Sequence, residues 1–542
     1  MRKFIFILFI CLASTVSFAQ QGWGDINESY YKFARLLGYI NLQYVDTVNI
    51  PKLTEKAVVE VLKNLDPHST YISKEDFQKA NEQLEGNFEG VGVEFSILND
   101  TLVIVSPISG GPSEKVGIQP GDRILAVDDK SIAGVGVKNE DIFKLLRGPK
   151  GTQVNLTIQR KGVKELLLFV VTRDKIPIFS VDAAYEVRPG VGYIKLSRFA
   201  STSMKEIRES FEKFSTTPEA LILDLRGNSG GILGVSIQLA DQFLDEKKII
   251  VYTEGVHSPK LVEYSTKSGI YKTGKLVVLI DEGSASASEI VSGAMQDWDR
   301  GILIGRRTFG KGLVQQQLPL GDGSYIRLTI ARYHTPTGRV IQSPYESGKN
   351  DKYYEAFAKR YSNGELYSKD SVQFPDSLIY KTLETGRSVY GGGGIMPDIF
   401  VPYDTTSYSK YYGKLVRSGT LNQFVLSYTD KNRASLQKSY PTFEEFNSGF
   451  EVTDDLFEQL VAYAEKEKLE RNEDDLKTSR DEISVMVKAL IARDLWSLNE
   501  YFRIVNATRD DDFKKAMDVI DRWDYYTKQL GIPLLHNIHY EQ

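Results

Sequence analysis

The sequence predicts a multidomain α/β protein that is helical at both ends. At 542 residues the chain is too long for one hydrophobic core, so we expect three or four domains. From Gly192 onward, strand-like apolar runs alternate with helical stretches, which is typical of a layered α/β core with largely buried strands. Helical periodicity prevails before residue 85 and after about Gly419.

Composition and charge exclude several classes of function. With 41% apolar and 26% charged residues and a net charge of -5, the chain resembles an ordinary soluble protein and offers no basic face for nucleic acid. Cys11 is the only cysteine, and the five histidines are scattered along the chain. We therefore expect no disulfide, no thiol catalysis, no metal site and no cofactor.

The first 19 residues have the order of a secretory signal. Arg2 and Lys3 precede the apolar run from residue 4 to residue 18, and Ser17-Phe18-Ala19 provides small residues before Gln20. A predominantly apolar run of 15 residues is short for a membrane-spanning helix, which needs roughly 20. We expect residues 1–19 to direct export to the periplasm. An uncleaved membrane anchor and an extracellular destination stay open.

Residues 20–85 are predicted to form a helical N-terminal domain. Two stretches carry apolar residues at helix spacing, and Asp66-Pro67-His68-Ser69 marks a turn after the second. The apolar positions are Tyr30, Phe33, Leu36, Leu37 and Ile40, then Ala57, Val58, Val61, Leu62 and Leu65.

The character of the sequence changes at Gly86. Residues 88–106 predict two strands joined at Asn99-Asp100, and the segment GIQPGDRILAVD, a helical stretch ending in LLRGPKGT and two further strands follow. In this order, residues 86–173 resemble a PDZ domain. A peptide C-terminus would add to the strand beginning at Val93, with its carboxylate held by the backbone of Gly90, Val91 and Gly92.

Residues 174–418 are predicted to form the α/β core, and residues 419–542 a helical C-terminal domain. In the core, LVQQQLPL and SYIRLTIARYHT are predicted to be antiparallel strands. In the C-terminal part, Ser479-Arg480-Asp481-Glu482 predicts a capping box that begins a helix. Asp510 to Asp512 are expected to be a helix start or a solvated face, and no chemistry is evident in this part.

The stretch LRGNSGG presents Ser229 as trypsin-like proteases present their nucleophile. A triad of that kind needs a histidine upstream in a double β-barrel, and the only one before Ser229 is His68, in the helical segment. The strand LILDLRG followed by glycines instead predicts a loop whose backbone amides open a helix and hold an anion. Ser229 is therefore not the expected nucleophile.

Gly305 to Gly312 fits the phosphate-loop pattern GxxxxGK. Gly312 replaces the magnesium-binding Ser or Thr, however, and a strand rather than a helix is predicted next. We expect no nucleotide partner.

The segments DEGSASASEI (281–290) and GKGLVQ (310–315) are the candidate catalytic site. A serine between a buried strand and a helix would lie at the positive end of the helix dipole. Without a usable histidine, Lys311 is the best placed base, and burial would have to lower its pKa by roughly 3 units from about 10.4. If 311–317 is a strand, Gln315 lies on the same side and can orient the amine. Taken singly, these patterns are also typical of helix caps and surface turns.

The run GSASASEIVSGAMQDWDRGILIGRRTFGKGLVQ resembles the active-site region of the carboxyl-terminal processing (tail-specific) proteases. The resemblance extends to LDPHSTYI, RGPKGT, LILDLRGNSGG and GGGGIMPDIFVP, and so covers about residues 28–402. It implies a crotonase-like α/β protease core with a PDZ domain. It also implies Ser286 as nucleophile, Lys311 as general base and Gln315 as the lysine-orienting residue. The amide of Ala287 and one from the Gly230-Gly231 loop would form the oxyanion hole.

We therefore expect an exported serine endopeptidase that binds the accessible C-termini of protein substrates through its PDZ domain. Arg147 is the expected residue coupling peptide binding to activation, and the helical ends are open to an adaptor or a second copy. The alternative is a catalytically silent PDZ scaffold that binds protein C-termini. A crotonase-like enzyme acting on acyl-thioesters is a weaker alternative, since it has no use for an exported PDZ domain.

Overall fold

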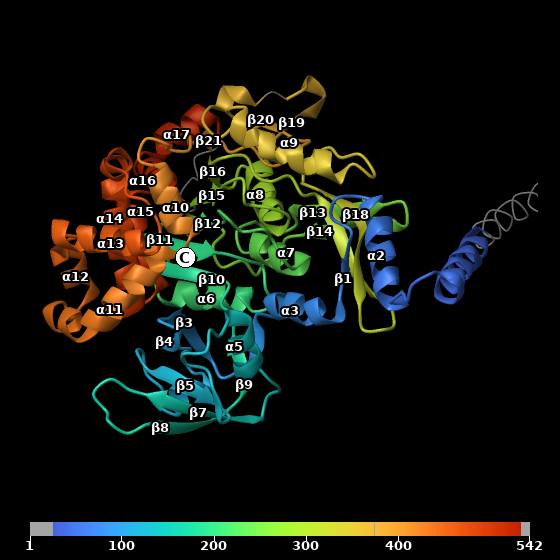
Figure 1. The fold of residues 1–542 in the computed structure, drawn as a ribbon. Coiled ribbons are helices and arrows are strands. Elements are labelled where there is room, and N and C mark those ends of the chain that lie inside the picture. Colours follow the sequence, from blue (N-terminus) through green and yellow to red (C-terminus); the bar gives the residue numbers. More distant parts are fainter. Residues whose placement is uncertain (1–24, 373, 533–542) are drawn as a thin grey trace, which may run out of the picture. The chain divides into compact units, whose positions relative to one another are not determined.

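The computed structural model describes residues 25–372 and 374–532 (Figure 1). The chain forms two compact units. One comprises the described residues through Ser73 with Gln317–Leu328 and Tyr345–Asn350, and the other comprises Lys74–Gln316, Thr329–Pro344 and the described residues from Asp351. The predicted signal at 1–19, Cys11 and the last two histidines lie outside the described residues.

The first unit is mainly helical. Residues 25–43 form a helix, and α2 (Ile50–Lys63) begins at Asn49, whose side chain accepts a hydrogen bond from the Lys52 amide at 3.0 Å. Asp66 closes the predicted turn by accepting the amides of His68 and Ser69 at 2.8 and 2.9 Å. A short strand was not predicted: β1 (Thr70–Ile72) pairs antiparallel with residues 325–327.

In the second unit, residues 93–172 form a six-stranded antiparallel sheet of order β3-β4-β5-β7-β8, in which β6 pairs with β5. Asn99 and Asp100, both with positive φ, join its first two strands as predicted. The bounds of the elements here are α3 (Lys74–Glu85), β2 (Asn87–Gly90), β3 (Val93–Leu98), β4 (Thr101–Pro107), α4 (Pro112–Lys115), β5 (Arg123–Val127), β6 (Lys130–Ser131), α5 (Asn139–Leu146), β7 (Gln153–Gln159), β8 (Leu167–Thr172) and β9 (Asp174–Pro177).

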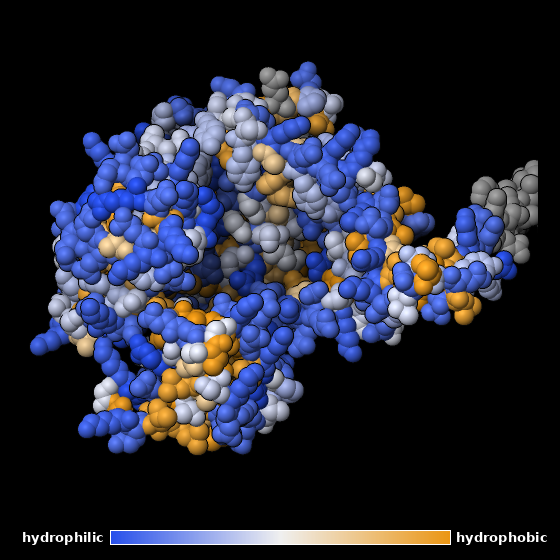
Figure 2. Space-filling view, in the orientation of Figure 1, coloured by the Kyte–Doolittle hydropathy of each residue, from blue (hydrophilic) through white to orange (hydrophobic). Residues whose placement is uncertain are grey.

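One face of this sheet is buried and the other is partly apolar and exposed. Leu102, Ile124 and Leu156 are completely buried in its core with Ile142 of α5. On the outward side, Leu168 and Val170 of edge strand β8 are 68% and 46% exposed. Figure 2 shows apolar side chains gathered over β5, β7 and β8.

The α/β core is a six-stranded sheet of order β10-β11-β12-β15-β16-β21, parallel except for β10 at one edge. The prediction of a layered core with buried strands is confirmed, because β12 and β16 are buried along their whole length. The bounds are β10 (Val181–Arg188), β11 (Val191–Leu196), α6 (Ser203–Glu212), β12 (Ala220–Asp224), α7 (Leu233–Asp241), β15 (Lys275–Ile280), α8 (Ala287–Asp297), β16 (Ile302–Gly305) and β21 (Ile399–Phe400).

The two faces of this sheet are covered by different parts of the chain. Leu221 and Leu223 of β12 pack in one cluster with α6, α7 and α8. Ile222, pointing to the opposite face, packs with Phe513 and Trp523 of α16 (Asp511–Asp521) and α17 (Trp523–Leu530). The last helices of the chain therefore complete the α/β core (Figure 1).

The remaining strands pair antiparallel with one another, as expected for LVQQQLPL and SYIRLTIARYHT. Tyr252 and Thr253 of β13 pair with His334 and Tyr333 of β18. The bounds are β13 (Ile249–Gly255), β14 (Ser258–Tyr264), β17 (Leu313–Pro319), β18 (Tyr325–His334), α9 (Asn350–Ser362), β19 (Ile379–Lys381) and β20 (Ser388–Tyr390).

A separate helical cluster precedes the last two helices and has its own apolar core. Its helices are α10 (Lys410–Arg417), α11 (Thr420–Ser439), α12 (Phe443–Gly449), α13 (Asp454–Lys466), α14 (Glu473–Leu495) and α15 (Leu498–Thr508).

The capping box predicted at Ser479 is wrong. The helix begins seven residues earlier, after Asn472, which accepts the Asp475 amide at 2.9 Å. Ser479 is buried inside α14, where its hydroxyl donates to the Ser407 carbonyl at 2.8 Å and accepts the Ser409 amide at 2.9 Å. Ser-x-x-Glu caps a helix only where the chain enters it, and here tertiary partners hold the hydroxyl instead.

Candidate active site

Ser286 stands at a sharp turn between the buried strand β15 and helix α8. Its backbone angles are φ 56° and ψ -112°, outside the regions that non-glycine residues favour. Ala285 and Ala287 beside it are buried, and Ala287 is the first residue of the helix. The turn presents the serine at the positive end of α8, as predicted, in a strained conformation that the surroundings must hold.

Lys311 and Gln315 contact each other. Lys311 Nζ donates to Gln315 Oε1 at 3.0 Å, so the predicted pairing of amine and amide is present. The condition considered for this pairing, a strand over 311–317, holds only from Leu313, where β17 begins. Gly310 and Gly312 keep the backbone around Lys311 in a loop, and the Gly312 amide is held by Gln342 Oε1 at 2.9 Å. The contact forms from this loop rather than from a strand.

Glu289 joins the serine turn to the lysine loop. Its carboxylate is fully buried, and Oε2 accepts the amides of Ser286 and Lys311, both at 2.8 Å. Oε1 accepts the Thr308 hydroxyl at 2.5 Å and the Gly310 amide at 2.8 Å. One carboxylate thus fixes the backbone of both candidate catalytic residues. Glu289 was not predicted from the sequence, although Ser286 and Glu289 have the Ser-x-x-Glu spacing of a capping box.

Tyr333 makes a second connection between the same two residues. The hydroxyl of this buried tyrosine contacts the carbonyl oxygens of Ser286, at 3.2 Å, and of Lys311. Tyr333 lies in β18, pairs with Thr253 of β13 and carried no signal in the sequence. Amides and carbonyls of Ser286 and Lys311 are therefore held together from two sides.

Burial raises the pKa of Glu289 from 4.5 to about 7, against the hydrogen bonds that favour its ionised form. The folded state then binds this proton more tightly than the unfolded chain. The contribution of Glu289 to the free energy of unfolding therefore falls by about 3 kcal/mol as the pH rises from 4.5 through 7.

We predict that the free energy of unfolding of the wild type, measured against Glu289→Gln, decreases by about 3 kcal/mol between pH 4.5 and 8. Glutamine does not titrate, so the difference between the two proteins isolates this carboxyl group. Urea unfolding at a series of pH values measures it. A difference that does not change with pH would contradict the prediction.

The loop after β12 lies directly against the serine turn. Gly230 and Gly231 have φ of 103° and 149°, which only glycine adopts readily. A Cβ on Gly230 would stand 2.8 Å from Ser286 Cβ and 3.0 Å from the Ala287 amide nitrogen. The structure therefore brings Gly230, Ser286 and Ala287 together, and it leaves room there for backbone alone.

Asn228 ties this loop in place. Its carbonyl accepts the Ala285 amide at 2.9 Å and the Ser288 hydroxyl at 2.8 Å, both from the serine turn. Its side chain accepts the Gly230 amide at 2.9 Å, so this amide is already bound within its own loop. The second amide of the loop that was predicted to bind an oxyanion is that of Gly231. Ser229 is exposed at the tip. The loop thus places backbone, and no side chain of its glycines, against the serine turn.

The predicted peptide-binding residues lie together at the start of β3. Gly92 has φ 75° and precedes Val93, which opens the strand. In the described part of the chain only β4 pairs with β3, so its other edge is open to an added strand. Phe143 of α5 packs beside this strand on Phe95, with ring centroids 5.4 Å apart.

Arg147 also belongs to this region. Its backbone pairs with Gly90, and its guanidinium donates to Glu82 of α3 at 2.6 Å. The same guanidinium stacks 4.7 Å from the Phe88 ring centroid and 5.4 Å from that of Phe143. The structure thus connects the predicted carboxylate-binding backbone to α3 through Arg147.

Residues 25–372 and 374–532 contain neither a candidate metal site nor a candidate membrane span. No group of three or more His, Cys, Asp and Glu side chains is arranged to hold a metal ion in this part of the chain. No helix within these ranges combines the length and the apolar character needed to cross a membrane.

Comparison with known proteins gives the family. A model of peptidase family S41 matches residues 190–346, and a PDZ domain model matches residues 103–160. The carboxy-terminal-processing protease of Bartonella bacilliformis is 36% identical over 353 residues, which are 63% of this chain and 80% of that protein. The chain belongs to the carboxy-terminal processing protease family.

A further relative agrees with this assignment. The carboxy-terminal processing protease CtpB of Bacillus subtilis is 34% identical over 325 residues, 59% of this chain and 67% of that protein. Among solved structures, the photosystem II D1 C-terminal processing protease is 28% identical and covers 57% of this chain and 89% of its own, with a TM-score of 0.33. This carboxy-terminal processing protease is a serine protease with a PDZ domain, and the predicted family and fold class are confirmed.

One part of the protease has no assigned role in these comparisons. Residues 411–497 match a family of unknown function, DUF8443. They cover most of the helical cluster α10–α14 and end just before α15.

Proposed function

We propose that this protein is an exported endopeptidase that cleaves protein substrates with a Ser286–Lys311 dyad after binding their C-termini at the PDZ domain. The observation that carries the proposal is the double connection of Ser286 to Lys311 through Glu289 and Tyr333. A silent scaffold has no need to hold these two residues together.

The catalytic steps follow from this arrangement. Neutral Lys311 Nζ, oriented by Gln315 Oε1, takes the proton of Ser286 Oγ, and Oγ attacks the peptide carbonyl. The amide of Ala287 and an amide of the Gly230-Gly231 loop stabilise the oxyanion. The lysine then returns the proton to the leaving amine. Water, deprotonated by the same lysine, hydrolyses the acyl-enzyme.

Recognition of the substrate C-terminus uses the open edge of β3. A substrate tail adds there as a further strand, and its carboxylate meets the backbone of Gly90, Val91 and Gly92. Export to the periplasm is supported by the apolar segment at 1–19. An adaptor or a second copy acting through the helical ends stays a prediction.

The test uses the protein without residues 1–19 and an unstructured protein ending in small apolar residues. We expect cleavage at internal sites of the substrate, which intact mass spectrometry detects. We also expect a slower rate of cleavage when the substrate C-terminus is amidated. Binding of the tail without cleavage would favour the scaffold and overturn the proposal. Equal rates with free and amidated C-termini would remove the PDZ domain from substrate recognition.

Arg147 carries a prediction about coupling. Glu82, which it binds, lies next to Gln83, and Gln83 Oε1 accepts Arg198 at 2.6 Å. The following residue, Phe199, donates its amide to the Gly230 carbonyl at 3.0 Å. A contiguous set of contacts therefore joins the PDZ domain to the predicted oxyanion loop.

We predict that Arg147→Gln reduces the stimulation of peptide cleavage by a free tail peptide roughly 10-fold, while the affinity for that peptide changes little. Arg173→Gln is the matched control, because Arg173 donates to carbonyls of residues 145, 146 and 153 inside the PDZ domain. Stimulation is measured as the ratio of initial rates with and without the tail peptide. An unchanged ratio in Arg147→Gln would remove the coupling role.

A further inference from the structure

The start of α16 carries three consecutive aspartates that differ in burial. Asp510 caps the helix by accepting the Phe513 amide at 2.9 Å, which confirms the predicted helix start. The side chains of Asp510 and Asp512 are only 10% and 6% exposed, whereas that of Asp511 is 51% exposed. A solvated face would expose all three alike. Two of these carboxylates therefore have partners in the α/β core.

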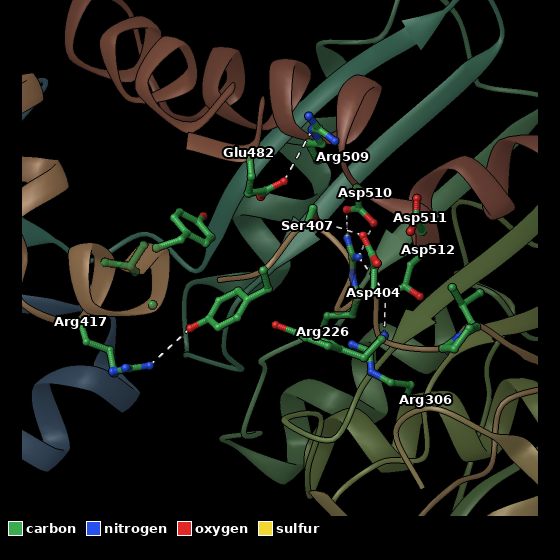
Figure 3. A pocket seen from close by; sticks show the side chains of 17 residues that line it. Arg226, Arg306, Asp404, Ser407, Arg417, Glu482, Arg509, Asp510, Asp511 and Asp512 are labelled. Carbon is green, nitrogen blue, oxygen red and sulfur yellow. Dashed lines mark hydrogen bonds and ion pairs between the residues drawn. The ribbon is translucent and has the colours of Figure 1, made fainter. Parts of the chain in front are cut away.

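The first partner is Arg226, the residue directly before the loop Gly227–Gly231. Its guanidinium binds both oxygens of Asp510 at 2.7 Å, and it also reaches Asp512 at 3.1 Å (Figure 3). On its other side it donates to Asp224, at the end of β12, at 3.0 and 2.5 Å. The base of the predicted oxyanion loop is thus held between the sheet and α16.

The second partner is Arg306, in the segment that leads from β16 to Lys311. It donates to Asp512 at 3.3 Å and to Glu282 at 2.9 Å, and Glu282 lies in the turn that leads to Ser286. Both arginines contact the same oxygen of Asp512, while the other oxygen has no hydrogen-bond partner among the described residues. Asp512 therefore connects the two arginines.

These contacts lie near the first residue of each of the three loops that form the proposed site. The loops are Gly227–Gly231, the turn that leads from Glu282 to Ser286, and the segment from Arg306 to Lys311. The loops are also bonded to one another: the Gly227 amide donates to Asp281 Oδ1 at 2.8 Å, and the Phe309 amide to the Ser284 carbonyl at 2.9 Å. A bidentate arginine–carboxylate pair fixes direction as well as distance. A shift of α16 would therefore reach all three loops.

We propose that α16 is part of the catalytic site's supporting structure, and that Asp510 and Asp512 are positioning residues that act through Arg226 and Arg306. The inference rests on the proposed Ser286–Lys311 mechanism. It makes the C-terminal helices a requirement for the chemical step rather than an added binding module.

The test is Asp512→Asn, which keeps the size of the side chain and removes its charge. We expect kcat for the unstructured substrate to fall about 30-fold with KM within twofold, since a small displacement of reacting groups costs rate rather than binding. Asp511→Asn is the control on the same turn, because Asp511 is exposed and, among the described residues, pairs only with Lys514, at 3.2 Å. We expect it to retain the wild-type rate.

A second measurement does not depend on activity. Hydrogen exchange by mass spectrometry should show faster exchange in 227–231, 281–287 and 307–311 of Asp512→Asn, with unchanged exchange in β12 and β15. If the wild type cleaves nothing, the proposed function fails, and the exchange data still decide whether α16 positions these loops.

Three results would overturn the inference: an unchanged kcat, a lower kcat with unchanged exchange in the loops, or faster exchange throughout the chain. Arg306→Lys gives the same test if Asp512→Asn does not fold. It keeps the charge and loses the planar fork, and we expect the same three segments to exchange faster.

Discussion

Replacing Ser286 with alanine, or Lys311 with methionine, should lower kcat/KM by roughly 10⁴-fold or more, while Ser229→Ala should keep the wild-type rate. Without Oγ there is no nucleophile, and without the amine nothing takes its proton, so either loss removes the acyl-enzyme route. Methionine retains the length and apolar stem of the lysine. Initial rates with the unstructured substrate measure the effect.

The control is informative because Ser229 stands in the more familiar protease motif. It is exposed at the tip of its loop. His334 of β18 is occupied elsewhere: it stacks on Tyr252 at 4.6 Å between ring centroids and lies 3.3 Å from Glu254. Activity surviving in Ser286→Ala but lost in Ser229→Ala would reverse the assignment. Circular dichroism of all three variants confirms that they fold.

Glu289→Gln should lower kcat by roughly 10³-fold with little change in KM. The carboxylate accepts four hydrogen bonds, two on each oxygen, from the serine turn and the lysine loop. The amide nitrogen of glutamine, in place of either carboxylate oxygen, would face a backbone N–H group and could not accept a hydrogen bond from it. The donors left without a partner would separate Ser286 from Lys311, and the loss would appear in the chemical step.

Ser292→Ala provides the matched control for Glu289→Gln. Ser292 is equally buried in α8, and its hydroxyl donates to the Ser288 carbonyl of the same helix at 2.8 Å. We expect this variant to keep its kcat, since it leaves both loops intact. Equal losses in the two variants would mean that any disturbance of α8 inactivates the enzyme and that Glu289 has no specific positioning role.

The sequence patterns that correctly predicted local structure involve residues close together in the chain. A buried apolar run, small residues and a helix start predicted the turn at Ser286, and a spacing of four residues predicted that Lys311 reaches Gln315. Conformation at these positions depends mostly on near neighbours. The same kind of pattern failed at Ser479, because Ser-x-x-Glu does not by itself indicate where a helix begins. At Ser286 that spacing does mark a helix start, and it would have revealed Glu289.

The sequence by itself determined a PDZ domain ahead of the peptidase core, the layered α/β class and the residue types available for chemistry, since motif order, periodicity and composition carry these. Only the tertiary structure decided what holds the catalytic groups together. Tyr333 reaches Ser286 across 47 positions, and Asp510 reaches Arg226 across 284. Neither pairing has a spacing or a motif to detect. Each depends on a strand register or a packed helix that exists only once the chain has folded.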